Sequence, residues 1–179
     1  MSKNILVISA SLRNGSNSDM LADEFMRGAL ESGNKAEKIT LRGKNINFCK
    51  GCLACQKTGK CVINDDMAEI LPKMQQADVI CFASPVYFYD MCGQLKTFLD
   101  RTNPLFPAEY NFTDIYFLIT AADTEQTASE GPLKGLQGWI DCFENAGLKG
   151  VVCGLGAEKP GDVKSMPAMN EAYMFGKKA

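Results

Sequence analysis

Four cysteines crowd into one short segment, where together they could hold a metal ion or an iron-sulfur cluster. Their spacing is C-x2-C-x2-C-x5-C, with the members Cys49, Cys52, Cys55 and Cys61. Glycines between them allow the backbone to wrap closely around a ligand. Tetrahedral zinc sites usually combine two C-x-x-C pairs about a dozen or more residues apart, whereas a compact run is typical of [4Fe-4S] ligation. The spacing therefore favours a cluster over zinc, with a disulfide as a further alternative.

A polar loop offers a second kind of chemistry, the binding of an anion. An apolar run is followed there by Ser11, Arg13, Ser16, Asn17 and Ser18, directly before a segment with helical periodicity. Unpaired N–H groups and the helix dipole favour a phosphate at such a helix start, and the guanidinium of Arg13 adds a charge-assisted contact. The alternative is a serine-rich helix cap beside a solvated arginine. Dinucleotide and nucleoside-triphosphate folds are disfavoured, because neither G-x-G-x-x-G after a strand nor a Walker spacing is present.

An aromatic turn supplies the surface that a flat, conjugated ligand needs. Another apolar run ends in Pro85, Val86, Tyr87 and Phe88. An isoalloxazine ring requires backbone hydrogen-bond partners along one edge and flat apolar cover, and this turn has both. The alternative is a buried strand end whose aromatic side chains belong to the core. Together with the phosphate loop, the turn indicates a flavin site.

Composition excludes several classes of chemistry. The 179-residue chain has no histidine, which removes Ser-His-Asp hydrolysis, Cys-His proteolysis and histidine-ligated metal sites. Its 19 Lys and Arg and 21 Asp and Glu give a net charge of −2, so no long-range field attracts nucleic acid or an anionic membrane. Without a long apolar stretch or a cleavage signal, we expect a cytoplasmic protein whose cysteines stay reduced. Four cysteines on apolar segments are expected to be ordinary buried thiols: Cys81, Cys92, Cys142 and Cys153.

Strands that alternate with helices must position these segments. Short apolar runs predict five strands, at residues 5–9, 36–41, 79–83, 116–120 and 151–155. Such alternation predicts an α/β fold in which helices cover both faces of a parallel sheet. The length suits one domain over residues 1–179. Ligands bind such sheets at the carboxyl ends of the strands, so we expect the site in the loops 10–18, 84–93 and 120–131.

Helical periodicity connects these strands. It predicts helices that begin near Ser18, near Asp65 and before Leu95, and a fourth over residues 133–146 that stops at Gly147. The tail from Gly161 has a weaker helical pattern that Pro167 interrupts.

The motifs together carry a resemblance to a known family. They are S-x-R-x-x-S-x-S at residues 11–18, the cysteine loop closing in Asn64-Asp65-Asp66-Met67, the Ser84-Pro-Val-Tyr-Phe88 turn, and Leu95-Lys-Thr-Phe-Leu-Asp-Arg101. With them the chain resembles, over most of its length, the NADPH-dependent FMN reductases and iron-sulfur flavoproteins of the flavodoxin-like superfamily. The resemblance implies a flavodoxin-like three-layer sandwich whose five-stranded parallel sheet has the order 2-1-3-4-5.

The resemblance also implies where the cofactors bind. The loop from Ser11 to Ser18 would hold the FMN phosphate, and the isoalloxazine and ribityl chain would lie along two further segments. These segments are Pro85, Val86, Tyr87 and Phe88, and Thr120, Ala121 and Ala122. In iron-sulfur flavoproteins the cysteine loop holds a cluster that passes electrons to FMN, whereas many related reductases carry a similar loop without one. Both states stay open for this loop.

The implied activity is that of a flavin-dependent oxidoreductase. NAD(P)H would reduce the bound FMN and leave before a flavin, quinone, other small molecule or redox protein accepts the electrons, which implies ping-pong turnover. No catalytic acid or base is expected, and Lys96, Asp100 and Arg101 are interpreted as a solvated helix face or a structural ion pair. A homodimer or homotetramer is expected. The alternative function is an electron-transfer flavoprotein that carries FMN, with or without the cluster.

Overall fold

A parallel sheet organises the chain, of which the computed structural model describes residues 2–179. Its strands are β1 (Asn4–Ser9), β2 (Lys35–Thr40), β3 (Val79–Tyr87), β5 (Asp114–Ala121) and β6 (Gly147–Leu155). They lie in the order β2-β1-β3-β5-β6, and the short strand β4 (Asp90–Met91) pairs antiparallel with the end of β3. The predicted five-stranded parallel order is therefore confirmed, with β4 as an addition.

The central strands are apolar at nearly every position because both faces of the sheet are covered. Residues 79–83 of β3 and 115–119 of β5 are buried throughout. Successive side chains of a strand point to opposite faces, so each run contributes to two separate cores. Phe82 and Phe117 belong to one core, and Cys81 and Leu118 belong to the other.

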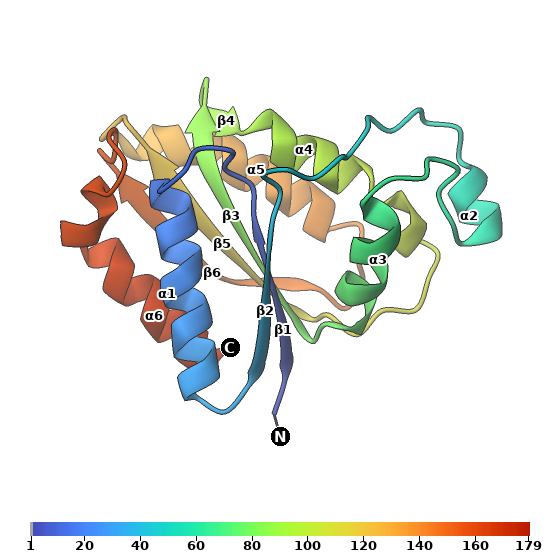
Figure 1. Cartoon of the computed structure of the whole chain (residues 1–179), viewed down its shortest axis with the longest axis horizontal. Helices are drawn as coiled ribbons and strands as arrows, with labels where there is room; N and C mark the ends of the chain where they lie inside the picture. Colours follow the sequence, from blue (N-terminus) through green and yellow to red (C-terminus); the bar gives the residue numbers. More distant parts are fainter. Residues whose placement is uncertain (1) are drawn as a thin grey trace.

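Helices cover the two faces unequally (Figure 1). One face is covered by α1 (Asn17–Glu31) and α6 (Pro167–Lys178), and the other by α3 (Met67–Gln76), α4 (Gly93–Asp100) and α5 (Glu130–Ile140). The short helix α2 (Ala54–Thr58) lies in the cysteine loop, away from the sheet. Three 3-10 turns complete the elements: Asn103–Leu105, Gln126–Ser129 and Asp162–Ser165.

Two glycines bring α1 and α6 into close contact. A Cβ atom built on Gly28 would collide with the carbonyl oxygen of Tyr173, and one built on Gly176 would collide with the carbonyl oxygen of Phe25. The two helix backbones therefore touch directly, which fixes α1 firmly against its neighbour. This matters for function because α1 begins at the predicted phosphate loop.

Two predicted helix boundaries differ from the structure. The helix predicted over 133–146 runs only from Glu130 to Ile140, and Gly147 begins β6 instead of ending the helix. Tight turns follow Ile140 and still bury Phe143, so the apolar spacing continues where the helix does not. Pro167 begins α6 rather than interrupting it, because a proline at the first helical position loses no hydrogen bond.

Exposure also corrects one expectation for the cysteines. Cys81 and Cys92 are buried and Cys153 is partly buried, but Cys142 is exposed because it lies in the turns after α5. Within residues 2–179, no helix combines the length and apolarity needed to cross a membrane.

Candidate functional site

Three loops meet at the carboxyl edge of the sheet. Ser9 at the end of β1 lies beside Ala83 of β3, and Pro85 lies beside Thr120 of β5. The backbone N–H of Ala10 continues this pairing with a 2.9 Å hydrogen bond to the carbonyl of Ala83. The structure thus brings the predicted phosphate loop, aromatic turn and β5 loop together at one place.

The start of α1 carries a buried hydroxyl with no partner. Ser16 caps the helix and accepts a hydrogen bond from the N–H of Asp19 at 3.2 Å, as the capping interpretation predicts. Ser18 is fully buried, and its hydroxyl has no hydrogen-bond partner among residues 2–179. Buried polar groups are normally paired, so this hydroxyl fits a site that an oxygen-rich anion completes.

Arg13 extends the same loop into solvent. Its side chain is exposed and donates one hydrogen bond to the carbonyl of Glu158 at 3.1 Å. Gly15 two residues later has a φ of 61°, a left-handed conformation that turns the chain into α1. The guanidinium can therefore supply further N–H groups to an anion at the helix start without first being desolvated.

Asn17 has a different position from the one that its grouping with the phosphate loop suggested. Its buried side-chain amide donates to the carbonyls of Ala157 and Lys159, at 3.1 and 2.9 Å. Its carbonyl oxygen accepts from the N–H groups of Gly161 and Val163, at 2.9 and 3.3 Å. These four bonds use the full capacity of the amide, so only the backbone N–H of this residue is left for an anion.

The aromatic turn is a strained hairpin. Tyr87 pairs with Asp90, and the two residues between them, Phe88 and Tyr89, have φ values of 51° and 60°. A two-residue turn with both φ angles positive usually contains Asn-Gly, since bulky residues resist this conformation. Phe88 is 103% exposed and Tyr87 is 51% exposed. The alternative interpretation of these aromatics as core residues is therefore wrong.

Contacts from the loop after β5 and from the start of α5 hold this hairpin in place. The hydroxyl of Tyr89 donates a 2.7 Å hydrogen bond to the carboxylate of Asp123, in the loop after β5. This bond raises the pKa of Tyr89, and the pKa of Asp123 is lowered by the N–H of Glu125 and then by Tyr89. Gly131 at the start of α5 leaves room for the carbonyl of Tyr89, because a Cβ atom there would collide with it. The sequence analysis did not predict the hydrogen bond between Tyr89 and Asp123, although Tyr89 directly follows the predicted turn.

The four loop cysteines surround one small cavity. Cys49, Cys52, Cys55 and Cys61 all line a hollow of about 20 Å³, together with Arg101. Burial, and then the neighbouring Cys61, raises the pKa of the Cys55 thiol. Among residues 2–179, no three Cys, Asp or Glu side chains form a ready-made site for a single metal ion. The donor set of four cysteines lining one cavity matches the ligands of a [4Fe-4S] cluster, whose separate iron atoms take one thiolate each.

Arg101 connects α4 to this loop. Its side chain is completely buried and forms an ion pair with the equally buried carboxylate of Asp65, at 2.6 Å. Burial alone would raise the pKa of Asp65, but the hydrogen bonds from Arg101 and Asn47 outweigh it and hold that pKa well below its usual range. The predicted structural ion pair is confirmed for Arg101, and the solvated face is confirmed for the exposed pair of Lys96 and Asp100.

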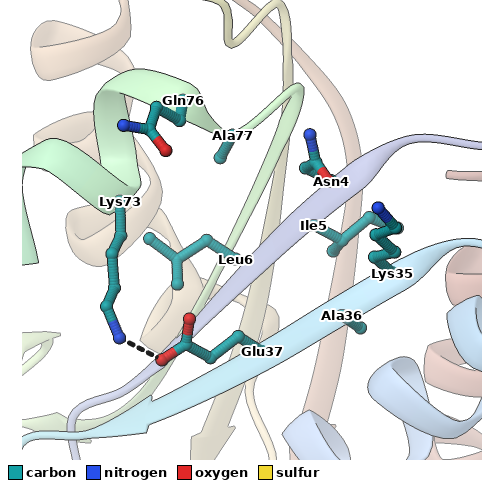
Figure 2. Close-up of a pocket in the computed structure, with 9 residues that line it drawn as sticks. All are labelled: Asn4, Ile5, Leu6, Lys35, Ala36, Glu37, Lys73, Gln76 and Ala77. Carbon is teal, nitrogen blue, oxygen red and sulfur yellow. Dashed lines mark hydrogen bonds and ion pairs between the residues drawn. The ribbon is translucent and has the colours of Figure 1, made fainter.

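Two pockets lie at opposite edges of the sheet. One of about 410 Å³ opens beside the carboxyl edge and is lined by Leu12, Phe48 and Gly93 among others. Another of about 280 Å³ lies where β1 and β2 begin, and Figure 2 shows Lys73 and Glu37 paired across it. None of the predicted site residues lines either pocket, and we place the candidate site at the carboxyl edge because the three predicted loops meet there.

Comparison with known proteins decides the family. The sequence profile of NADPH-dependent FMN reductases matches residues 3–129. The chain belongs to this family. A Bacillus subtilis protein assigned as an NAD(P)H-dependent FMN-containing oxidoreductase is 30% identical to this FMN reductase family member over 172 residues, which cover 89% of the chain and 88% of the relative.

One further sequence relative and one solved structure are similar to this family member. An iron-sulfur flavoprotein of Methanocaldococcus jannaschii is 44% identical over 101 residues, 56% of the chain. The match spans only about half of that relative, 52% of its length. In fold, the FMN reductase family member is similar to the NAD(P)H:quinone oxidoreductase from Methanothermobacter marburgensis, with a TM-score of 0.74, 18% identity, and 99% and 97% of the two chains covered.

We predict that Asn17 supports the site from within the protein. Replacing Asn17 with Ala should lower the free energy of unfolding of the ligand-free protein by about 2 to 4 kcal/mol, because buried partners lose their hydrogen bonds. Denaturant unfolding measures the change. The control is Asn14→Ala, because the exposed side chain of Asn14 accepts one hydrogen bond, from Arg42, and its loss should change stability by less than about 0.5 kcal/mol. Equal stability of Asn17→Ala and the wild type would contradict the supporting role.

Proposed function

We propose that this protein binds FMN at the carboxyl edge of the sheet and uses NAD(P)H to reduce a small-molecule or protein acceptor through it. The observation that carries the proposal is the buried Ser18 hydroxyl at the start of α1, which has no hydrogen-bond partner among residues 2–179 and belongs to the same loop as Arg13. Family membership supports the choice of FMN over other phosphate ligands. When bound, FMN supplies the hydride and electron chemistry, and the chain supplies binding and orientation.

Each loop has its own part in holding the cofactor. Ser11, Ser16 and Ser18, with the first N–H groups of α1, would bind the phosphate, and Arg13 would neutralise its charge. Pro85 to Phe88 and Thr120 to Ala122 would follow the ribityl chain and the isoalloxazine. The Tyr89–Asp123 hydrogen bond joins these two segments, so it keeps both walls of the site at a constant separation.

A single open face at the proposed flavin site accounts for the proposed ping-pong order, in which the donor leaves before the acceptor binds. Fully exposed Phe88 leaves the surface beside the hairpin accessible to solvent, and the described chain carries no second nucleotide fold. The nicotinamide donor and the acceptor would then use the same face in turn. A second copy of the chain would cover part of this exposed aromatic surface and leave the flavin face open, and for this reason we propose a homodimer or homotetramer. The eight free cysteines favour the reducing cytoplasm as its compartment.

A second function is favoured by the cysteine loop. All four cysteines line one cavity, and the similar Methanocaldococcus protein is named an iron-sulfur flavoprotein. Cys49, Cys52, Cys55 and Cys61 would hold a [4Fe-4S] cluster, and the chain would then transfer single electrons between that cluster, FMN and a redox protein. The two functions share the flavin site and differ in the acceptor.

We predict that the phosphate is recognised through Arg13. Titration of the flavin-free protein should show FMN binding more tightly than FAD or riboflavin. Arg13→Ala should weaken FMN binding about ten- to a hundredfold through loss of a charge-assisted contact worth about 1.5 to 3 kcal/mol, and should leave riboflavin binding unchanged. Arg27→Ala is the matched control, since Arg27 pairs with Glu24 and Glu31 and lies over the ring of Tyr173, toward the C-terminal end of α1. Equal affinity for riboflavin and FMN would reject the phosphate site.

We predict parallel lines in initial-rate plots against donor and acceptor. NADH or NADPH should reduce the FMN-loaded protein in the absence of any acceptor, because one open face serves both substrates in turn. Stopped-flow absorbance of the flavin measures the first half-reaction. Intersecting lines would mean that both substrates bind at the same time, and they would reject the proposal that donor and acceptor use one flavin face in turn. If neither NADH nor NADPH reduces the bound FMN while a low-potential protein donor reduces it rapidly, the reductase function is rejected and the electron-transfer function takes its place.

We predict that the cysteine loop binds iron. Anaerobically reconstituted protein should contain about four iron atoms per chain. Changing any one of Cys49, Cys52, Cys55 or Cys61 to Ser should lower that content while FMN stays bound, because the four ligands act as a set. Iron analysis and the visible spectrum measure both quantities, and the exposed Cys142 provides the control substitution. Iron near zero in the reconstituted wild type would reject the cluster.

A further inference from the structure

The cysteine loop leaves and rejoins the fold through a narrow stem. The N–H of Asn45 donates to the carboxylate of Asp66 at 2.7 Å, and the N–H of Asp66 donates back to the carbonyl of Asn45 at 3.1 Å. Next to them, the N–H of Asn47 donates to the carboxylate of Asp65 at 2.9 Å. The stem consists of these few bonds, and the segment between residues 47 and 65 is attached further by a 3.2 Å hydrogen bond that the side chain of Gln56 donates to Asn103.

Arg101 reaches this stem from the end of α4. One guanidinium nitrogen, Nη1, donates to the carbonyl of Asn47 at 2.7 Å and to the carboxylate of Asp65 at 2.6 Å. The other, Nη2, donates to the second oxygen of Asp65 at 2.9 Å and to Sγ of Cys61 at 3.6 Å. One buried cation therefore touches both ends of the loop and one of its four cysteines.

We propose that Arg101 is the positioning residue of the cysteine loop: its guanidinium closes the stem through Asn47 and Asp65 and holds the sulfur of Cys61 toward the shared cavity. No other fixed cation touches a loop cysteine among the described residues. The planar fork is essential to this role, because its two nitrogens serve four acceptor atoms on three residues at once, which the single ammonium of a lysine does not match.

The same contact has an electrostatic consequence for a bound cluster. A buried guanidinium beside a ligand sulfur stabilises negative charge on that sulfur, and a cluster gains negative charge when it takes up an electron. Arg101 would therefore raise the reduction potential of a cluster held by this loop. This part of the inference rests on the proposed cluster, whereas the positioning role does not.

The positioning role is tested on metal-free protein by the rate at which each cysteine is alkylated, followed by mass spectrometry. Arg101→Met and Arg101→Lys should speed the labelling of Cys55 and Cys61 by about tenfold or more, since an opened stem exposes both thiols. Cys81 in the core strand β3 should label as slowly as in the wild type, which shows that the fold is intact. Unchanged labelling of Cys55 and Cys61 in a folded variant overturns the proposal.

Matched variants separate the contacts. Lys96→Met removes an exposed cation from the same helix and should change no labelling rate. Asp65→Asn keeps the size of the side chain but removes the ion pair, and it should reproduce the faster labelling. If the Arg101 variants do not fold, the labelling rates of Asp65→Asn decide the test instead. Equal labelling rates in Lys96→Met and Arg101→Met would overturn the role of this particular arginine.

The electrostatic part is tested on reconstituted protein by a redox titration monitored by electron paramagnetic resonance. Arg101→Met removes the charge and should lower the midpoint potential of the cluster and hasten iron loss to a chelator, with FMN still bound. An unchanged potential in iron-loaded Arg101→Met overturns the electrostatic part. A wild type that takes up no iron rejects the proposed cluster and this part with it, while the alkylation rates still decide the positioning role.

Discussion

Parallel pairing of β1 with β3 is the constraint on which the candidate site depends. The chain passes from β1 to β2 on one side and returns to β3 on the other, so the strand order reverses between β1 and β3. Loops that leave two such strands diverge and leave a crevice above the sheet. The pairing of Ser9 with Ala83 sets where that crevice lies, and the start of α1 and the hairpin face it from the two sides. A shift of this register would separate the phosphate loop from the aromatic turn.

The features that followed from the sequence are those with a local cause. Continuous apolar runs such as 79–83 require a strand covered on both faces, and serine-rich segments before helical periodicity require a cap. The features that did not follow depend on contacts between distant segments. Asn17 is joined to residues 157–163 and Arg101 to Asp65, and nothing near either residue in the sequence indicates its partner. Periodicity also failed at Phe143, because a turn can bury a side chain as well as a helix can.

Strain is concentrated where the site is open. Phe88 and Tyr89 adopt a left-handed conformation that costs about 1 to 2 kcal/mol for a residue with a side chain. The pairing of β3 with β4, the bond to Asp123 and the close approach of Gly131 oppose this cost. The result is an aromatic side chain that projects into solvent from a rigid support. An Asn-Gly turn would relieve the strain, but it would remove the side chain that the turn displays.

The narrow stem of the cysteine loop has a consequence for how this fold diverges. Because residues 47 and 65 lie side by side, the segment between them can grow, shrink or be exchanged without moving β2 or α3. Lengthening a loop whose ends are already joined costs little, since the entropy of closure rises only slowly with length. The segment that carries the four cysteines can therefore differ between related chains while the carboxyl edge of the sheet keeps its arrangement.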